Sequence, residues 1–298
     1  MIKKMKNKTI VLAYSGGLDT SYCLKKLSTE GFSVHALLIN TGGFSKSDLN
    51  KIEKQAKKLG ASRFISIDAE EEFYNKIIKF LIFGNVLKNN SYPLSVSSER
   101  IIQAIEIMNY SKKHNINNIA HGSTGAGNDQ VRFDSIFQTL NPNIKIITPI
   151  RDNNISRKKE ISYLKSMGIN LTWNKSRYSI NKGIWGTTIG GDETLTSNKP
   201  LPDKAFTKKL LEKRNKLIDL KFFKGELIGI NNKVSNPIEL INYLEQISSK
   251  YAIGRDIHVG DTIIGIKGRV GFEAAAAKII IKSHELLEKH TMSKWQIF

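Results

Sequence analysis

The sequence predicts an α/β fold, in which a doubly wound parallel sheet is followed by a second, α+β domain. Short apolar strands alternate with helical patterns through the first half of the 298 residues, which is typical of a parallel sheet with helices on both faces. Near residue 170 this alternation stops, and residues 173–201 are rich in Gly, Thr, Ser and Asn without a clear period. We therefore expect one domain over residues 1–170 and another over residues 171–298.

The elements of the first domain follow from hydrophobic periodicity and from the residues that end them. Gly31 and Gly60 stop the first two helices, and Ser156 caps the last one. A polar loop is expected at 88–97. The expected strands are 9–14, 33–39, 63–67, 118–120 and 145–148, and the expected helices are 19–30, 48–59, 70–83, 99–114 and 157–168.

The second domain has fewer clear signals. Strands at 217–223 and 226–230 flank Lys224-Gly225, which predicts a hairpin. Asn236-Pro237 is a cap followed by a first-turn proline, so a helix should run from there to residue 252. We expect a further strand at 262–266 and a last helix at 274–289, and we interpret 173–201 as a long loop or crossover.

Composition limits the class of protein. Hydrophobic residues make up 40% and no apolar run approaches the roughly 20 residues that a membrane span needs. The apolar run behind the basic N-terminus is too short for a signal peptide. The single cysteine, Cys23, excludes internal disulfides, and the six histidines show no ligand spacing, so we expect a cytoplasmic protein without a metal site of its own. The net charge is +19, but the lysines are scattered over helix faces, which argues against nucleic-acid binding.

The segment with the clearest chemistry is the glycine loop, Ala13-Tyr14-Ser15-Gly16-Gly17-Leu18-Asp19-Thr20-Ser21. A strand, a glycine turn and a helix start bring backbone N–H groups and a helix N-terminus against an anion. The glycines allow close approach, and the hydroxyl groups of Ser15, Thr20 and Ser21 add donors. The alternative is a plain connection between a strand and a helix.

A second polar segment, residues 121–133, follows the expected strand at 118–120. Its sequence, HGSTGAGNDQVRF, combines three glycines with the side chains of Thr124, Asn128, Asp129 and Arg132. A guanidinium or amide suits the carboxylate of an amino acid, and a carboxylate suits its amine. The segment therefore predicts an amino-acid site, with an ordinary polar turn as the alternative.

Together these segments resemble the argininosuccinate synthase family of PP-loop ATP pyrophosphatases, which joins citrulline to aspartate with ATP and releases AMP and pyrophosphate. The resemblance covers essentially the whole chain. It includes AYSGGLDTS at 13–21, Tyr92-Pro93-Leu94, segment 121–133, Pro149-Ile150-Arg151, Tyr178-Ser179-Ile180 and residues 265–269. It implies a nucleotide-binding PP-loop domain of the adenine nucleotide alpha-hydrolase type, followed by a synthetase domain.

The resemblance also implies site residues. Catalytic roles would fall to Asp19 and Asp129, with Asp129 orienting the substrate amine, and Mg²⁺ would accompany ATP. ATP would be held by Ala13, Tyr14, Ser15, Gly16, Gly17, Leu18, Asp19, Thr20 and Ser21, together with Ile39 and Gly122. Aspartate would be held by Thr124, Asn128 and Asp129. Citrulline would be held by Tyr92, Ser97, Asn128, Arg132, Ser179 and Thr188.

Several positions depart from the family pattern. Ala126 replaces a lysine, and Thr188 replaces a serine while keeping the hydroxyl. Gly260 and Phe272 stand where a citrulline-binding Glu and Tyr are expected. Other departures are Asn40 and Gly43, which replace Asp and Gln, and the segment 95–101. Loss of the carboxylate at 260 suits a citrulline whose amine is acylated, although Asp261 could replace it for plain citrulline, which is our working interpretation.

The family's pattern continues beyond Phe298 into a C-terminal extension that makes subunit contacts. We therefore expect a homo-oligomer weaker than the family's tetramer. Two other functions remain open from the sequence: a PP-loop enzyme that modifies tRNA, for which the single cysteine is unfavourable, and a catalytically inactive paralogue with a binding role.

Overall fold

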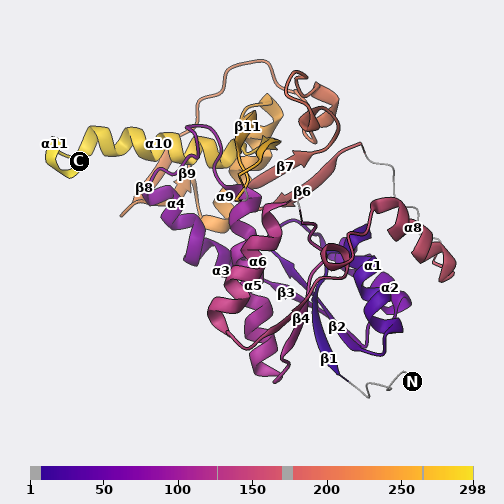
Figure 1. Ribbon diagram of the computed structural model, residues 1–298. Coiled ribbons are helices and arrows are strands. Elements are labelled where there is room, and N and C mark those ends of the chain that lie inside the picture. Colours follow the sequence, from indigo (N-terminus) through magenta and orange to yellow (C-terminus); the bar gives the residue numbers. More distant parts are fainter. Residues whose placement is uncertain (1–7, 126, 170–176, 264, 298) are drawn as a thin grey trace, which may run out of the picture. The chain divides into compact units, whose positions relative to one another are not determined.

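The computed structural model describes residues 8–125, 127–169, 177–263 and 265–297. The chain forms two compact units, and neither is continuous in sequence (Figure 1). The first unit contains residues 1–69 and 100–176, and the second contains residues 70–99 and 177–298.

A five-stranded parallel sheet forms the centre of the first unit, in the order β3-β2-β1-β4-β5 (Figure 1). The chain builds the sheet outward from β1 in one direction and then, from β4, in the other. The point where the order reverses therefore lies between β1 and β4. The strands are β1 (Thr9–Ala13), β2 (Ser33–Asn40), β3 (Arg63–Asp68), β4 (Asn118–Ala120) and β5 (Lys145–Ile147).

Helices join these strands, as a parallel sheet requires. The second helix has a complete capping box between Ser45 and Asp48, and Gly60 ends it in a left-handed conformation (φ 103°). The helices are α1 (Leu18–Thr29), α2 (Lys46–Leu59), α5 (Ser95–Lys113), α6 (Asn128–Leu140), α7 (Pro149–Asp152) and α8 (Arg157–Ser166). The first five residues of α5 belong to the second unit.

The core of the first unit lies between the sheet and helices α1, α2 and α8. Leu12 and Val34 of the strands are fully buried there with Leu24, Leu27 and Leu164 of the helices. Burying side chains of this size contributes about 1.5–3 kcal/mol each. This packing fixes where β1 ends and α1 begins.

The second unit contains two antiparallel sheets. One has the order β10-β9-β8, and the other has the order β11-β12-β7-β6. The strands are β6 (Ser179–Gly183), β7 (Gly186–Gly190), β8 (Leu220–Phe223), β9 (Glu226–Ile230), β10 (Lys233–Val234), β11 (Arg255–Asp261) and β12 (Lys267–Glu273).

A helical segment early in the chain belongs to this second unit. It runs through α3 (Glu70–Phe73), a π-helical turn (Tyr74–Ile78) and α4 (Lys79–Phe83). The Tyr74 hydroxyl donates to Oε2 of Glu226 (2.8 Å), and Asn85 contacts His284. The remaining helices are α9 (Pro237–Ser248), α10 (Ala275–Thr291) and α11 (Lys294–Ile297), with 3₁₀ turns at Asp192–Leu195, Asp203–Ala205 and Ser249–Tyr251.

The predicted fold class is confirmed, and the strands and helices of the first half lie within a few residues of their predicted positions. Three local predictions are wrong. Helix α5 begins at Ser95, inside the predicted loop at 88–97. Residues 262, 263, 265 and 266 do not form a strand, and Ile264 lies outside the described residues. The amide of Thr262 donates to the carbonyl of Ile266 (2.7 Å) in the turn that joins β11 to β12.

The third wrong prediction is the loop at 173–201, because this range contains the β6–β7 hairpin. In addition, helix α6 was not predicted. Ala126 and residues 173–176 lie outside the described residues. Within the described part of the chain, no helix has the length and apolar character to cross a membrane.

Candidate active site

The glycine loop lies at the carboxyl end of β1, beside the point where the strand order reverses. The amide of Tyr14 still pairs with the carbonyl of Leu37 on β2 (2.8 Å), and the chain then turns at Gly16 with φ +77°. Gly17 is exposed and precedes α1. The first-turn N–H groups of α1 have no intrahelical acceptor, so the loop has the geometry of an anion site.

A side chain from α2 holds this loop in place. Nε2 of Gln55 donates to the carbonyl of Gly16 (2.9 Å) and to the hydroxyl of Ser21 (2.8 Å). The Ser21 hydroxyl in turn lies 3.5 Å from the Tyr14 hydroxyl, and burial raises the pKa of Tyr14 to about 12, against the effect of these hydrogen bonds. Tyr14 therefore acts as a neutral, packed side chain. The sequence pattern did not predict a role for Gln55.

Segment 121–133 begins at the end of β4, the strand next to β1, so its first residues lie beside the glycine loop. A Cβ atom on Gly122 would lie 3.2 Å from the carbonyl carbon of Asp19. This close approach explains a glycine at position 122. Ile39 is buried in β2, on the other side of β1, and the side chain of Asn40 accepts from the amides of Gly42 and Phe44 (both 3.2 Å).

The expected amino-acid site contains two arginines around one carboxylate. Nε of Arg100 lies 2.9 Å from Oδ2 of Asp129, and a guanidinium nitrogen of Arg132 lies 2.8 Å from Oδ1. Burial favours the neutral form of Asp129, but the charges and hydrogen bonds of the two arginines outweigh it and lower the pKa. The structure thus brings Asp129 and Arg132 together and adds Arg100, which the sequence did not single out. Thr124 is exposed, and Asn128 starts α6.

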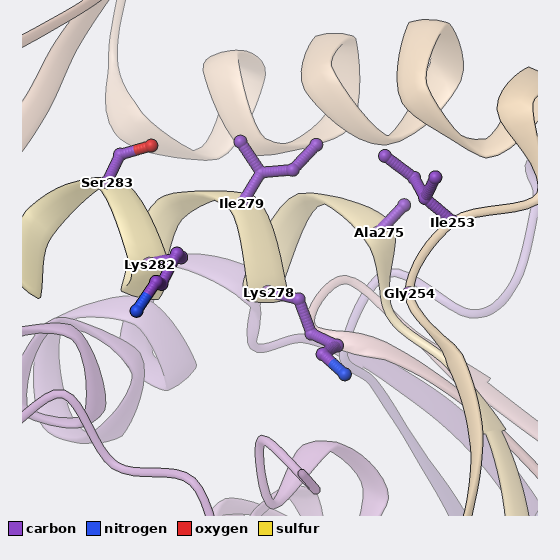
Figure 2. A pocket seen from close by; sticks show the side chains of 7 residues that line it. All are labelled: Ile253, Gly254, Ala275, Lys278, Ile279, Lys282 and Ser283. Atoms are coloured by element: carbon purple, nitrogen blue, oxygen red, sulfur yellow. The ribbon is translucent and has the colours of Figure 1, made fainter. Parts of the chain in front are cut away.

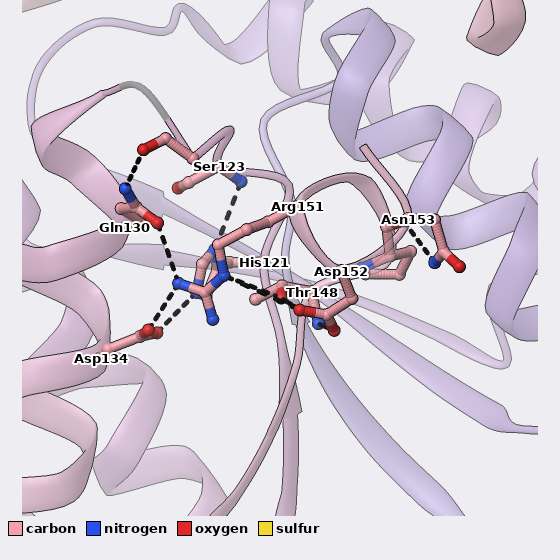
Figure 3. Close-up of polar contacts among 10 residues, drawn as sticks. His121, Ser123, Gln130, Asp134, Thr148, Arg151, Asp152 and Asn153 are labelled. Atoms are coloured by element: carbon pink, nitrogen blue, oxygen red, sulfur yellow. Dashed lines mark hydrogen bonds and ion pairs between the residues drawn. The ribbon is translucent and has the colours of Figure 1, made fainter. Parts of the chain in front are cut away.

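A second network joins residues of segment 121–133 to Asp134 and Arg151 (Figure 3). Nε2 of His121 lies 2.8 Å from Oδ1 of Asp134, and Arg151 donates to the other carboxylate oxygen (2.6 Å) and to Oε1 of Gln130 (3.2 Å). The amide of Ser123 donates to Nδ1 of His121 (3.2 Å), so that atom is the acceptor and Nε2 carries the proton.

The Asp134 carboxylate is therefore ionised. Through His121 and Arg151 it links the end of β4 and helix α7 to its own helix, α6. Burial favours its neutral form, but the hydrogen bonds from His121 and Arg151 lower its pKa overall. The sequence did not identify Asp134 as important. Its spacing could have indicated a role, because Gln130 and Asp134 are four residues apart and therefore share one face of α6.

Four of the expected citrulline residues belong to the second unit. Tyr92 is buried, with its ring 5.1 Å from that of His258 and 5.2 Å from that of Phe272. Phe272 pairs with Thr188 across β12 and β7. Tyr92 and Thr188 therefore both lie next to Phe272. Ser179 pairs with Gly190 in the same sheet, and the Ser97 hydroxyl donates to the carbonyl of Leu94 (3.1 Å).

His258 was not predicted as a site residue. It is 7% exposed, and its Nδ1 atom has no hydrogen-bond partner among the described residues. Burial lowers its pKa, with a further contribution from the charge of Lys88 against that of Asp256. A Cβ atom on Gly260 would lie 2.7 Å from Nε2 of His258. The imidazole therefore occupies the space beside the glycine.

The second unit also has a pocket along α10 (Figure 2). Its lining is apolar except for Lys278, Lys282 and Ser283, and it contains none of the expected site residues. No group of three or more His, Cys, Asp or Glu side chains that could hold a metal ion occurs among the described residues.

Comparison with known proteins assigns both halves of the chain. Residues 9–170 match the family model described as the arginosuccinate synthase N-terminal HUP domain, and residues 178–297 match the arginosuccinate synthase C-terminal domain. Among solved structures, a 4-thiouridine synthetase–RNA complex with bound ATP overlaps 54% of this chain and 41% of that chain, with a TM-score of 0.42 and 11% identity.

Curated relatives match along nearly the whole chain. Argininosuccinate synthase from Sulfurisphaera tokodaii is 37% identical over 95% of this chain and 73% of its own length. The protein of the same name from Methanocaldococcus jannaschii is 36% identical over 95% of this chain and 72% of its own length. These matches cover both units, and we conclude that the chain belongs to the argininosuccinate synthase family.

Proposed function

We propose that this protein joins citrulline to aspartate with ATP and releases argininosuccinate, AMP and pyrophosphate, as a ligase of arginine biosynthesis. The observation that carries the proposal is the match of both halves of the chain to this family, together with a glycine loop at the switch point of a parallel sheet. The relatives do not favour an N-acylated citrulline, a tRNA substrate or an inactive binding protein.

The proposed reaction has two steps. The ureido oxygen of citrulline attacks the α-phosphorus of ATP and displaces pyrophosphate, which leaves a citrullyl adenylate. The amine of aspartate then attacks the activated ureido carbon, AMP departs, and the nitrogen loses a proton. This chemistry depends on positioning and on neutralising charge more than on a covalent nucleophile.

The residue roles in this proposal follow the family resemblance. The glycine loop holds the phosphates of ATP, with the backbone of Ile39 and Gly122 beside the nucleotide. Asp19 and Asp129 have catalytic roles, and Thr124, Asn128 and Asp129 hold aspartate. Citrulline is held by Tyr92, Ser97, Asn128, Arg132, Ser179 and Thr188. The pairing of Asp129 with Arg100 and Arg132 supports a site that is already charged and ordered before ligands bind.

Three finer points belong to the same proposal. Mg²⁺ arrives with ATP, on phosphate oxygens and water, which is its usual coordination with nucleotides. The protein forms homo-oligomers, since Leu286 and Trp295 of α10 and α11 leave large apolar surface exposed. It works in the cytoplasm, which suits a free, buried Cys23. Along the sequence we assign residues 1–170 to the ATP-binding domain and 171–298 to the synthetase domain, although residues 70–99 belong to the second compact unit.

The test is pyrophosphate release with each substrate omitted in turn. We expect sustained release over many turnovers to require ATP, citrulline and aspartate together. In Asp19→Ala this rate should fall at least about 100-fold, the size of effect seen when one group is removed from preorganised electrostatic stabilisation. Asp219→Ala, which changes an exposed aspartate outside the site, is the matched control. Release that proceeds without citrulline, or faster with N-acetylcitrulline, would contradict the proposal.

A further inference from the structure

Two carboxyl side chains meet where α8 packs against α1 in the first unit. Asp19 lies in the first turn of α1, within the glycine loop, and Glu160 lies on α8. The packing of these helices is specific: the rings of Tyr22 and Tyr163 are 5.2 Å apart, and the hydroxyls of Thr29 and Tyr163 are 2.9 Å apart. Glu160 is only 2% exposed, whereas Asp19 is partly exposed.

The contact between these two groups requires a proton. The side chains of Glu160 and Asp19 share a hydrogen bond, yet two ionised carboxylates have no hydrogen to share. Oε2 of Glu160 is buried and has no N–H or O–H hydrogen-bond donor among the described residues, which is unfavourable for a charged carboxylate. The proton therefore belongs on the more buried partner, Glu160.

The other ionisable groups around Glu160 do not reverse this assignment. On α1 it faces Asp19, Tyr22 and the buried thiol of Cys23, and among the basic side chains of its own helix it is Arg157 whose charge acts on it. Burial, followed by the charge and the hydrogen bond of Asp19, raises the pKa of Glu160 to about 8 against the opposing effect of Arg157. Glu160 is thus mostly neutral at pH 7 and charged above about pH 8.

We propose that Glu160 is a positioning residue of the glycine loop: its neutral carboxyl donates a hydrogen bond to the Asp19 carboxylate and fixes that carboxylate at the start of α1. Loss of the proton places a second negative charge beside Asp19, close to where the proposed function puts the phosphates of ATP. The loop then binds ATP more weakly. The inference rests on the proposed function only for the identity of ATP as the ligand.

The test compares Glu160→Gln, which keeps a neutral donor, with Glu160→Ala, which removes it. ATP affinity is measured by calorimetry with ATP and Mg²⁺ alone, between pH 6.5 and 9. We expect Glu160→Gln to stay within about twofold of the wild type at pH 7 and Glu160→Ala to lose about five- to twentyfold, in the range of a hydrogen bond to a charged group. Glu53→Gln, on the surface of α2, is the matched control.

The pH profile separates positioning from simple packing. Wild-type affinity should fall by up to about tenfold between pH 7 and 9, since a group with a pKa near 8 goes from about nine-tenths to about one-tenth protonated over this range. The profile of Glu160→Gln should be flat over this range. Equal losses in Glu160→Gln and Glu160→Ala at pH 7, or an unchanged alkaline decline in Glu160→Gln, would overturn the inference.

A direct titration covers the case in which Glu160→Ala fails to fold. The carboxyl carbon of Glu160 in ¹³C-labelled wild-type protein should titrate near pH 8, and in Asp19→Asn its pKa should fall while staying above that of a free glutamate. A normal carboxyl titration in the wild type would overturn the inference. These measurements need no ligation activity, so they remain decisive even if citrulline and aspartate are not the substrates.

Discussion

Gly122 lies against the backbone of Asp19, so that a Cβ atom at position 122 would come within 3.2 Å of the Asp19 carbonyl carbon and 3.3 Å of the Thr20 amide nitrogen. This contact joins the ends of β4 and β1 and couples segment 121–133 to the glycine loop. Backbone atoms cannot rotate away as a side chain can, so an added methyl group must displace one of the two loops.

We predict that Gly122→Ala weakens ATP binding. Overpacking of this kind costs about 1–3 kcal/mol, and we expect most of the cost to appear as displacement of the glycine loop rather than as global unfolding. Gly127→Ala is the control, because the nearest atom to its added Cβ would be Oγ1 of Thr124 at 3.9 Å. Calorimetric ATP affinity should fall in the first variant more than in the second. Equal affinities in the two variants would show that the contact does not matter.

Neighbouring glycines in the glycine loop should respond differently. Gly16 has φ +77° and faces Ile52, with an added Cβ 3.0 Å from Cγ1, so Gly16→Ala should lower stability by about 1–3 kcal/mol. An added Cβ on Gly17 would contact only Oγ of Ser15, at 3.4 Å, among the described atoms within 4 Å. Gly17→Ala should therefore keep the wild-type melting temperature within about 2 °C, since alanine for glycine at a helix start costs little beyond the cap.

The same Gly17→Ala variant should nevertheless bind ATP poorly, because the methyl group occupies the surface that the phosphates approach. ATP affinity and melting temperature are measured on both variants. If Gly17→Ala bound ATP as tightly as the wild type, the assignment of the phosphates to this loop would be wrong.

The ionisation of Asp134 should make the stability of the fold depend on pH in the acidic range. Its pKa is lower in the folded protein than in the unfolded chain, because the hydrogen bonds from His121 and Arg151 outweigh burial. The ionised carboxylate therefore stabilises the fold above the unfolded pKa of about 3.9, and this contribution is lost as the pH falls through the lower folded pKa.

Asp134→Asn removes that contribution. Denaturant unfolding from pH 2.5 to 7 should show the variant less stable than the wild type above about pH 4.5, with the difference shrinking toward pH 2.5. Asp219→Asn, at an exposed aspartate, serves as the control. A stability difference that stays constant down to pH 2.5 would mean that the charge of Asp134 is unimportant.

Gly260 and His258 should be energetically coupled. An added Cβ at 260 would lie 2.7 Å from Nε2 of His258, whose ring is stacked 5.1 Å from that of Tyr92. We expect Gly260→Ala to cost about 1–3 kcal/mol of stability. Gly190→Ala, in the same sheet and with no atom within 4 Å of its added Cβ among those described, should cost less.

A double-mutant cycle checks the cause. In a His258→Ala background, the penalty of Gly260→Ala should largely disappear, because the atom that it meets is gone. The same penalty in both backgrounds would place the strain elsewhere. The coupling, if found, explains why glycine stands at 260 in this chain.

The sequence determined the features that depend on neighbouring residues. The apolar run of β1, the two glycines after it and the periodic helix behind them are all local, so the glycine loop could be located directly. The same holds for segment 121–133 and for the capped helices. Strand 262–266 was wrongly predicted because an apolar run resembles a strand even where it forms a turn, here between β11 and β12.

The tertiary structure decided what depends on partners that are distant in the sequence. β7 consists of Gly and Thr except for Ile189, so no hydrophobic period marks it, yet it is mostly buried in a sheet where β6 and β12 pair with it on both sides. The pairings of Asp129 with Arg100 and of Asp134 with His121 and Arg151 each join separate elements. The same is true of Glu160 and Asp19, since only the packing of α8 on α1 buries one carboxyl beside the other. Spacing along a chain fixes which face a side chain occupies, but the charge it carries depends on which groups the fold brings to that face.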